Sequence, residues 1–299
     1  MKIHYGNFLQ ENFEVMDKET LIPIPFTFNV VQKRYNEILT EEYPEMEGVR
    51  EIVLKARQEG MSSFILALFA TDFLLRPYSV SICISHRKDA TDVLFKKVKS
   101  YIDSYFRVLA KKNKMDPDDI AKQFLKSDNR NLLENATNGA MFYIGTAGAK
   151  VGGRGGTARN ILFSECAFYQ DTDLITAQEI VVGTAQQVPQ GRGMIFIEST
   201  ANGTDNYYQQ TWEKASRHES VYHPRFFGWQ EFYTKEWVEE KRKEFPSDRM
   251  WKQEYPADPD EAFVVSGSPY FNTELLKKML EEIHQPIRQG KFAADGIIY

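Results

Sequence analysis

Four short apolar runs stand out from the hydrophobic and polar pattern of this chain. They cover residues 50–54, 79–85, 159–163 and 194–198. Each run is rich in β-branched or aromatic residues and is bounded by polar or glycine-containing segments, as is typical of strands buried on both faces of a sheet. Apolar residues at helical spacing lie before and between the runs, at residues 30–39, 62–75, 89–109 and 172–184. Strands that alternate with helices predict an α/β fold, with a mostly parallel sheet sandwiched by helices.

Weaker patterns complete the expected organisation. The first twenty residues suggest an arm or a small subdomain, and a strand pair is expected at 131–133 and 140–144 with a turn at Asn138-Gly139. Towards the end of the chain we expect a helix at 236–244, a short strand at 262–265, a helix at 272–284 and the start of a strand at residue 296.

Composition narrows the class of protein. Of the 299 residues, 42% are hydrophobic and 26% charged, the net charge is -5 and the pI is about 5.7, so basic residues that contact nucleic acid would have to be clustered. No apolar stretch reaches the roughly 20 residues that span a bilayer, and no signal-peptide pattern is present, so we expect no membrane association. Cys83 and Cys166 lie within apolar runs and are expected to be buried, reduced thiols.

A glycine loop follows the first strand and leads into the helix at 62–75. It reads KARQEGMSS over residues 55–63, here named the glycine loop. In the usual phosphate-binding pattern Gly60 and Ser62 fit, but Met61 replaces the lysine and Lys55 replaces the first glycine. Our hypothesis is that the lysine has moved to the start of the loop and still reaches phosphate; the alternative is a solvated surface loop. The expected nucleotide-binding residues of the loop are Lys55, Ala56, Arg57, Gln58, Glu59, Gly60, Met61, Ser62 and Ser63.

Polar residues also end two other strong strands. Glu165 follows the third strand, where a carboxylate could activate a water, and residues 199–203 follow the fourth. The carboxyl ends of parallel strands meet at one edge of a sheet, so these residues and the glycine loop together favour nucleotide hydrolysis. Taken singly, Glu165 could be an ordinary strand-end carboxylate and Asn202-Gly203 an ordinary turn. The histidines show no metal-ligand spacing.

The motifs, in their order along the chain, resemble a known family. They are FTFN with Gln32, then KARQEGMSS, GGRGGTARNILFSECAF, ESTANG and WKQEYPADPDEAFVVSG. This series is similar to the ATPase half of the large terminase subunit of tailed double-stranded DNA bacteriophages, from about residue 20 to the end. The resemblance implies a P-loop fold of the additional-strand, RecA-like type. It also implies a P-loop ATPase core with an N-terminal arm at 1–215 and a lid or linker subdomain at 216–299.

The resemblance assigns roles to particular residues. Lys55 would be the phosphate lysine, Gln32 would read the adenine, Glu165 would be the catalytic carboxylate of Walker B, and Arg154 would be an arginine finger supplied to a neighbouring subunit. The segment that links hydrolysis to movement, here named the coupling segment (residues 199–203), would act through Ser199, Thr200, Asn202 and Gly203. The cofactors implied are ATP and Mg²⁺.

One position departs from the family pattern. Walker B usually ends in Asp-Glu, but here Ser164 precedes Glu165, so the aspartate that supports magnesium is missing. Either Ser164 holds the metal through a water, or another carboxylate such as Asp171 or Asp173 compensates, or turnover is slow. The expected magnesium residues are Ser62, Ser63 and Ser164.

The resemblance further implies a motor that moves double-stranded DNA into a procapsid. The expected partners are the DNA, the portal protein, the small terminase subunit and further copies of the chain, as a pentameric ring on the portal and a monomer in isolation. DNA would be held through its phosphates, with 86–88 or 96–97 as candidate basic clusters. The family's nuclease would begin near residue 296, so we expect an isolated ATPase domain without nuclease activity. It would act in the host cytoplasm and be absent from the mature virion.

Two other functions stay open at the level of sequence. A helicase or recombinase ATPase would share the same strand-end chemistry but would separate strands of forked DNA. A nucleotide-binding assembly module could have lost turnover together with the Walker B aspartate.

Overall fold

The computed structural model describes residues 3–17, 20–148 and 156–263, together with 279, 282, 291–293 and 296–298. The chain forms two compact units, Met1–Val264 and Val265–Tyr299. In the second unit β11 (Lys291–Ala293) pairs antiparallel with β12 (Gly296–Ile298), which confirms the strand expected at residue 296. The helix expected at 272–284 lies almost entirely outside the described residues.

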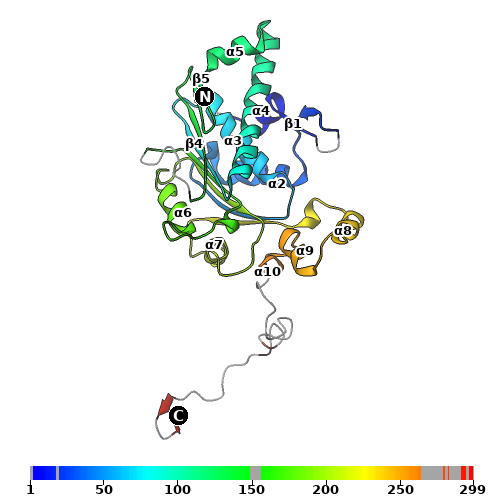
Figure 1. Ribbon diagram of the computed structural model, residues 1–299, viewed down its shortest axis with the longest axis vertical. Helices are drawn as coiled ribbons and strands as arrows, with labels where there is room; N and C mark the ends of the chain where they lie inside the picture. The colour runs from blue at the N-terminus through cyan, green and yellow to red at the C-terminus, as the bar shows by residue number, and fades with distance from the viewer. Residues whose placement is uncertain are drawn as a thin grey trace. The chain divides into compact units, whose positions relative to one another are not determined.

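An eight-stranded sheet, counted over the described residues, forms the centre of the first unit (Figure 1). The strands lie side by side in the order β10-β3-β9-β8-β4-β7-β6-β5. Neighbours are parallel from β10 to β7, and β6 and β5 continue the sheet antiparallel. The bounds are β3 (Val49–Lys55), β4 (Val80–Ser85), β5 (Leu125–Asp128), β6 (Leu132–Asn135), β7 (Met141–Thr146), β8 (Asn160–Ser164), β9 (Met194–Ser199) and β10 (His223–Phe227). The predicted α/β class, the four strong strands and the turn before β7 are confirmed.

Helices cover both faces of this sheet (Figure 1). One hydrophobic core contains buried residues of α1 (Tyr5–Asn12), α2 (Val30–Glu42), α3 (Met61–Leu75) and α4 (Lys88–Asn113). A second core, on the other face, contains buried residues of α6 (Ala177–Ala185) and α7 (Tyr207–Ser216). Within β3, Val53 joins the first core and the next residue, Leu54, joins the second, because successive strand residues point to opposite faces. This is why the strands read as continuous apolar runs.

Smaller elements complete the first unit. The N-terminal arm pairs β1 (Glu14–Met16) with β2 (Pro23–Pro25), and α5 (Pro117–Phe124) follows α4. The short 3-10 helices are η1 (Pro44–Met46), η2 (Cys166–Phe168) and η3 (Trp229–Glu231). Cys83 and Cys166 are buried free thiols, as expected, and burial raises the pKa of each. No helix among the described residues is long and apolar enough to cross a membrane.

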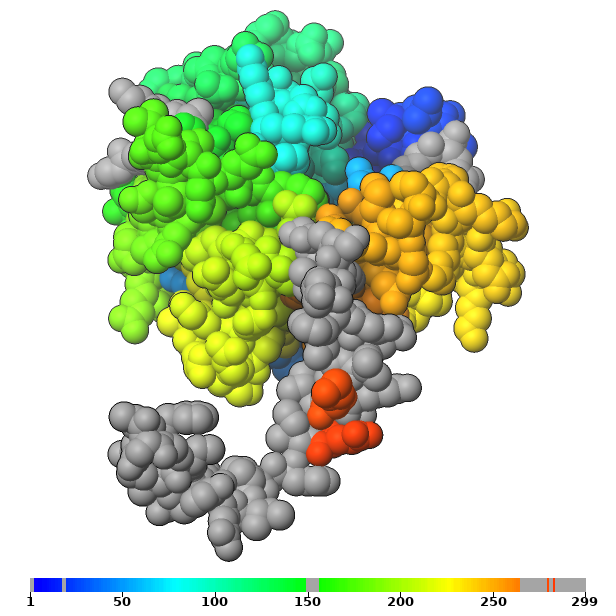
Figure 2. Space-filling view, turned by 60° about the horizontal axis from the view of Figure 1, so that its bottom comes forward, coloured from blue at the N-terminus to red at the C-terminus, as the bar shows by residue number. Residues whose placement is uncertain are grey.

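The region after β10 contains the helix expected at 236–244 but not the strand expected at 262–265. It forms η3, α8 (Lys235–Arg242), α9 (Asp248–Glu254) and α10 (Pro259–Ala262). The strand expected at 262–265 is wrong in its described part: Asp258 caps α10 by accepting the Glu261 N–H at 2.8 Å, and Pro259 occupies the first turn, where proline favours a helix. Figure 2 shows this region in yellow and orange. The predicted division at residue 215 stays a prediction, although β10 joins the main sheet.

The strand order decides which side chains meet. β9 lies between β3 and β8, and Glu198 on β9 stands opposite Ser164 on β8 in the register. The carboxyl ends of β3, β9, β8 and β4 therefore lie next to one another at one edge of the sheet. In open α/β sheets this edge is where ligands bind.

Candidate functional site

The glycine loop joins β3 to α3 at this edge. Gly60 has φ +77°, which favours glycine, and a Cβ there would lie 2.7 Å from the side-chain nitrogen of Gln32. Gly60, the N-cap residue of α3, has no side chain that could cap the amides of the first turn, and a helix N-terminus of this kind favours an anion. Met61, which occupies the place of the usual lysine, is buried in the first core. A cation at the phosphates would therefore have to come from another position.

Lys55 is the last residue of β3, and its side chain is only 6% exposed. Its Nζ lies 3.1 Å from Glu165 Oε1 and 3.2 Å from Glu198 Oε2. Burial alone would lower the pKa of Lys55, but the charges of Glu165 and Glu198 outweigh it and raise the pKa. Lys55 is therefore a permanently charged ammonium at the edge of the sheet.

Glu165 follows β8 directly and connects the glycine loop with the coupling segment. Its backbone has φ 53°, an uncommon conformation for a residue other than glycine. Oε1 accepts from Lys55, and Oε2 accepts from the Thr200 N–H at 3.3 Å and the Ser199 hydroxyl at 3.4 Å. Burial alone would raise the pKa of Glu165, but the ammonium of Lys55 and the Thr200 N–H hold it below its usual value. The carboxylate is thus ionised and able to accept a proton.

The coupling segment also contacts the residues just after Glu165. Ser199 Oγ accepts the Ala167 N–H at 3.2 Å, and Asn202 Nδ2 donates to the Ala167 carbonyl at 3.1 Å. Gly203 has a positive φ of 67°, as a turn after the strand requires. A displacement of Glu165 or Ala167 would therefore change the hydrogen bonds of this segment directly.

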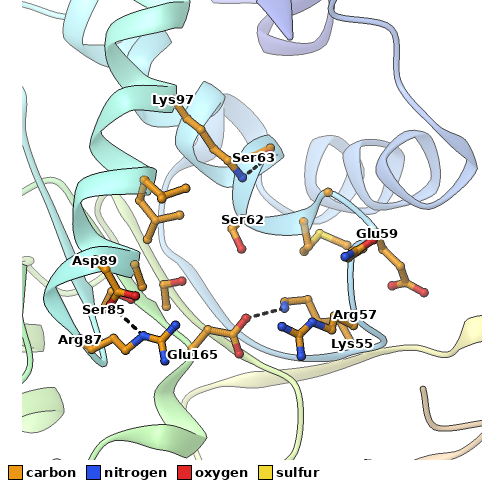
Figure 3. A pocket seen from close by; sticks show the side chains of 17 residues that line it. Lys55, Arg57, Glu59, Ser62, Ser63, Ser85, Arg87, Asp89, Lys97 and Glu165 are labelled. Carbon is orange, nitrogen blue, oxygen red and sulfur yellow. Dashed lines mark hydrogen bonds and ion pairs between the residues drawn. The ribbon is translucent and has the colours of Figure 1, made fainter. Parts of the chain in front are cut away.

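The two serines of the glycine loop point in different directions (Figure 3). Ser62 Oγ donates to Glu198 Oε1 at 2.7 Å and so faces the strand ends. Ser63 Oγ accepts from Lys97 of α4 at 2.9 Å, and its carbonyl accepts from the Tyr101 hydroxyl at 3.2 Å. Of the two residues that the sequence left open for magnesium, Ser62 is the one that faces the carboxylates.

Glu198 is a site residue that the sequence analysis did not single out. It lies on β9, is 0% exposed, and accepts from Ser62 Oγ at 2.7 Å and from Ser164 Oγ at 2.6 Å. The signal in the sequence was an acidic residue inside an otherwise apolar strand, read there as part of the strand's end. Its importance becomes visible only when β9 is placed between β3 and β8.

Gln32 supports the glycine loop from the first turn of α2. Its Nε2 donates to the Gly60 carbonyl at 2.9 Å, and its Oε1 accepts the Asn29 N–H at 3.2 Å. Asn29 caps the same helix and donates from Nδ2 to the Glu59 carbonyl at 2.9 Å. The capping box thus fixes the loop as well as the helix. The role of Gln32 in reading adenine stays a prediction.

Two neighbouring cavities open at this edge among the described residues. The first, of about 530 Å³, is lined by most of the glycine loop together with Arg87, Lys97, Ser164 and Glu165 (Figure 3). The second, of about 680 Å³, shares Arg57, Arg87 and Glu165 with the first and extends to Thr200 and Gly148. Both volumes are in the range of small-molecule sites.

The region from η3 to α10 packs against the glycine loop. The Arg57 N–H donates to the Glu254 carbonyl at 2.8 Å, its guanidinium pairs with the Glu254 carboxylate at 3.0 Å, and the Tyr233 hydroxyl donates to the Arg57 carbonyl at 2.8 Å. Ala56 is buried in a cluster with Trp251 and Tyr255. Arg154, the expected arginine finger, lies outside the described residues.

The donor chemistry of the edge fits a magnesium ion. Ser62, Ser164, Glu165 and Glu198 present oxygen atoms, the ligands that Mg²⁺ prefers. Glu198 does not itself line the first cavity, but it contacts Ser62 and Ser164, which do. Of the carboxylates that the sequence offered as substitutes, Asp171 instead accepts the N–H of Ala177 at the start of α6, and Asp173 is exposed. Elsewhere among the described residues, Glu42, Glu51 and His223 lie together, but Arg225 already pairs with both carboxylates.

Solved structures with the same fold are those of phage large terminases. The bacteriophage HK97 large terminase is 12% identical over 91% of this chain and 58% of its own, with a TM-score of 0.60. The large terminase of a thermophilic bacteriophage, in complex with ADP, is 11% identical over 75% of this chain and 52% of its own, with a TM-score of 0.51. A variant of the Thermus phage P74-26 large terminase ATPase domain is 17% identical over 81% of this chain and 95% of its own, with a TM-score of 0.50.

No family model matches the chain, and no curated protein matches it in sequence. At identities this low the likeness concerns the fold, which is that of large terminase ATPase domains.

Proposed function

We propose that this chain is the ATPase of a viral DNA-packaging motor, which couples ATP hydrolysis to the movement of double-stranded DNA into a procapsid. The observation that carries the proposal is the position of Glu165, whose carboxylate contacts Lys55 of the glycine loop on one side and the coupling segment on the other. The shared fold with large terminase ATPase domains, one of them in complex with ADP, supports it.

The roles of Lys55, Glu165 and the two serines follow from their contacts, whereas that of Arg154 rests on its place in the sequence. Lys55 and the first-turn amides of α3 would hold the β and γ phosphates, and Glu165 would accept a proton from the attacking water. Mg²⁺, when bound beside Ser62 and Ser164, would neutralise charge on the phosphates. Arg154 would stabilise the transferring phosphoryl group in a neighbouring subunit.

Coupling would start at the Glu165 carboxylate. If Glu165 turns towards the attacking water, it loses its contacts with Ser199 and Thr200, and the coupling segment gains freedom to move. The DNA-contacting residues remain a proposal. Arg87 and Lys97 line the first cavity, which favours a phosphate role for these two cations, whereas Lys96 is exposed on α4.

Glu165→Gln tests the proposal, because it keeps the shape but removes the base. We expect magnesium-dependent ATP hydrolysis in the presence of DNA to fall by about 10³-fold, with nucleotide binding retained. Glu11→Gln, an exposed carboxylate on α1, is the matched control and should hydrolyse ATP like the wild type. Equal inactivity of wild type and Glu165→Gln under single-turnover conditions would favour a nucleotide-binding assembly module. Strand separation on forked DNA would favour a helicase, and ATP-driven uptake of DNA by procapsids a packaging motor.

A further inference from the structure

Glu198 is a fully buried carboxylate that the mechanism above does not use. Oε1 accepts hydrogen bonds from Ser62 and Ser164, and Oε2 lies 3.2 Å from the ammonium of Lys55. A buried, ionised carboxylate without a neighbouring cation is strongly unfavourable, so Glu198 needs a positive partner whenever it is ionised.

Its location matches the departure seen in the sequence. Ser164 occupies the place where an aspartate usually precedes the catalytic glutamate, and Ser164 stands directly opposite Glu198 in the β8-β9 register. A carboxylate is therefore present on the neighbouring strand, β9, instead of on β8. This carboxylate, that of Glu198, accepts a hydrogen bond from the hydroxyl of Ser62 in the first turn of α3. The same three elements, β8, β9 and α3, surround it.

The charge balance of the site requires a cation there when nucleotide binds. Lys55 serves both Glu165 and Glu198 in this structure. Once its ammonium is shared with phosphates, Lys55 no longer serves the two carboxylates alone. The other cations that line the first cavity have different partners, since Arg57 pairs with Glu254, Arg87 pairs with Asp89 and Lys97 donates to Ser63. A divalent cation beside Glu198 restores the balance, and the oxygen donors around it suit Mg²⁺.

We propose that Glu198 supplies the carboxylate of the magnesium site and replaces the aspartate that Ser164 lacks. Ser62 and Ser164 complete the protein's share of this site. The inference rests on the proposed ATPase function and identifies the metal-binding residue of that function. The alternative is that Glu198 only balances the charge of Lys55 and has no part in metal binding.

Glu198→Gln distinguishes these roles when the binding of a fluorescent ATP analogue is measured at increasing Mg²⁺. We expect the half-saturating Mg²⁺ concentration to rise by about tenfold to a hundredfold, as is typical when a residue around a metal is lost. Affinity for the analogue in EDTA should stay close to that of the wild type. Glu51→Gln is the matched control, because it also removes a buried charge on the sheet but lies at the opposite end of β3; its Mg²⁺ dependence should be that of the wild type.

The double variant Ser164→Asp with Glu198→Gln returns the carboxylate to β8 and should regain most of the Mg²⁺ dependence. Circular dichroism establishes that each variant is folded. Unchanged Mg²⁺ dependence in a folded Glu198→Gln overturns the metal role and leaves the ATPase proposal intact. If wild type itself does not bind the analogue, the ATPase proposal fails, and the assignment of Glu198 fails with it.

Discussion

The two ends of β3 each carry a buried charged residue, and their surroundings differ. At the amino end, Glu51 accepts from the hydroxyls of Tyr35 and Tyr43 at 3.1 and 2.8 Å, and from the Arg225 guanidinium at 2.8 and 3.1 Å. At the carboxyl end, Lys55 faces two carboxylates and borders a cavity of about 530 Å³.

The difference separates a charge whose partners are all supplied by the fold from a charge that a ligand can reach. Both oxygens of Glu51 are saturated by hydrogen bonds, so this end can only stabilise the fold. Lys55 is held by charge pairs that a polyphosphate can replace, and the cavity gives a ligand access to it. The same strand thus carries Glu51, whose hydrogen bonds are all made within the fold, and Lys55, whose ion pairs face a cavity.

Replacing Lys55 should have the largest effect. In Lys55→Ala two carboxylates lose their shared cation, so we expect the free energy of unfolding to fall by about 3 kcal/mol and nucleotide binding to be lost. Urea denaturation and binding of a fluorescent ATP analogue measure the two effects. Lys112→Ala, an exposed lysine at the end of α4, should change neither. Retained nucleotide affinity in Lys55→Ala would show that another cation holds the phosphates.

Replacing Glu51 should affect stability alone. Glu51→Gln weakens the bonds from Arg225 and two tyrosines, and we expect the free energy of unfolding to fall by about 2 kcal/mol. Nucleotide affinity should not change. The partly exposed partner Glu42 provides the control, since Glu42→Gln should cost less than about 1 kcal/mol. A loss of nucleotide affinity in Glu51→Gln would remove the distinction between the two ends of β3.

A third buried ionisable residue, Glu59, should make the stability of the protein depend on pH. Neither carboxyl oxygen of Glu59 in the glycine loop has a hydrogen-bond partner among the described residues, and burial raises the pKa of Glu59 to about 9. The folded protein then keeps a proton that the unfolded chain releases near pH 4.5. Stability should therefore fall as pH rises from about 4.5 to about 9.

Glu59→Gln removes this titration. Relative to wild type, its free energy of unfolding should increase between pH 4 and pH 6 by about 2 kcal/mol, as measured by urea denaturation at both values. Glu11→Gln, in which the lost carboxylate is exposed, should show no such increase. A difference between Glu59→Gln and wild type that is constant across pH would mean that Glu59 ionises normally.

The smallest expected effect concerns Asn29, which caps α2 and also donates to the glycine loop. Asn29→Ala and Thr176→Ala each remove a capping box, at α2 and α6, and each should cost about 1 kcal/mol of stability. Only Asn29 also donates to the Glu59 carbonyl, so only Asn29→Ala should weaken binding of the ATP analogue. Equal affinity in the two variants would mean that the glycine loop does not need this support.

The sequence by itself determined the elements and several members of the site. Apolar runs and the turn at Asn138-Gly139 are local signals, and each produced the expected strand or hairpin. Because residues that follow parallel strands meet at one edge of the sheet, the pattern also predicted that Lys55 and Glu165 belong to one site. In the structure Lys55 Nζ lies 3.1 Å from Glu165 Oε1.

Only the tertiary structure showed that a carboxylate lies beside Ser164. Glu198 reads as part of an ordinary strand until β9 lies between β3 and β8, since its contacts with Ser62 and Ser164 span 136 and 34 residues of sequence. The same holds for β10, whose pairing with β3 was not expected. Sequence patterns record which face of an element is buried, whereas strand order depends on hydrogen bonds between distant segments, and this order placed a carboxylate beside Ser164.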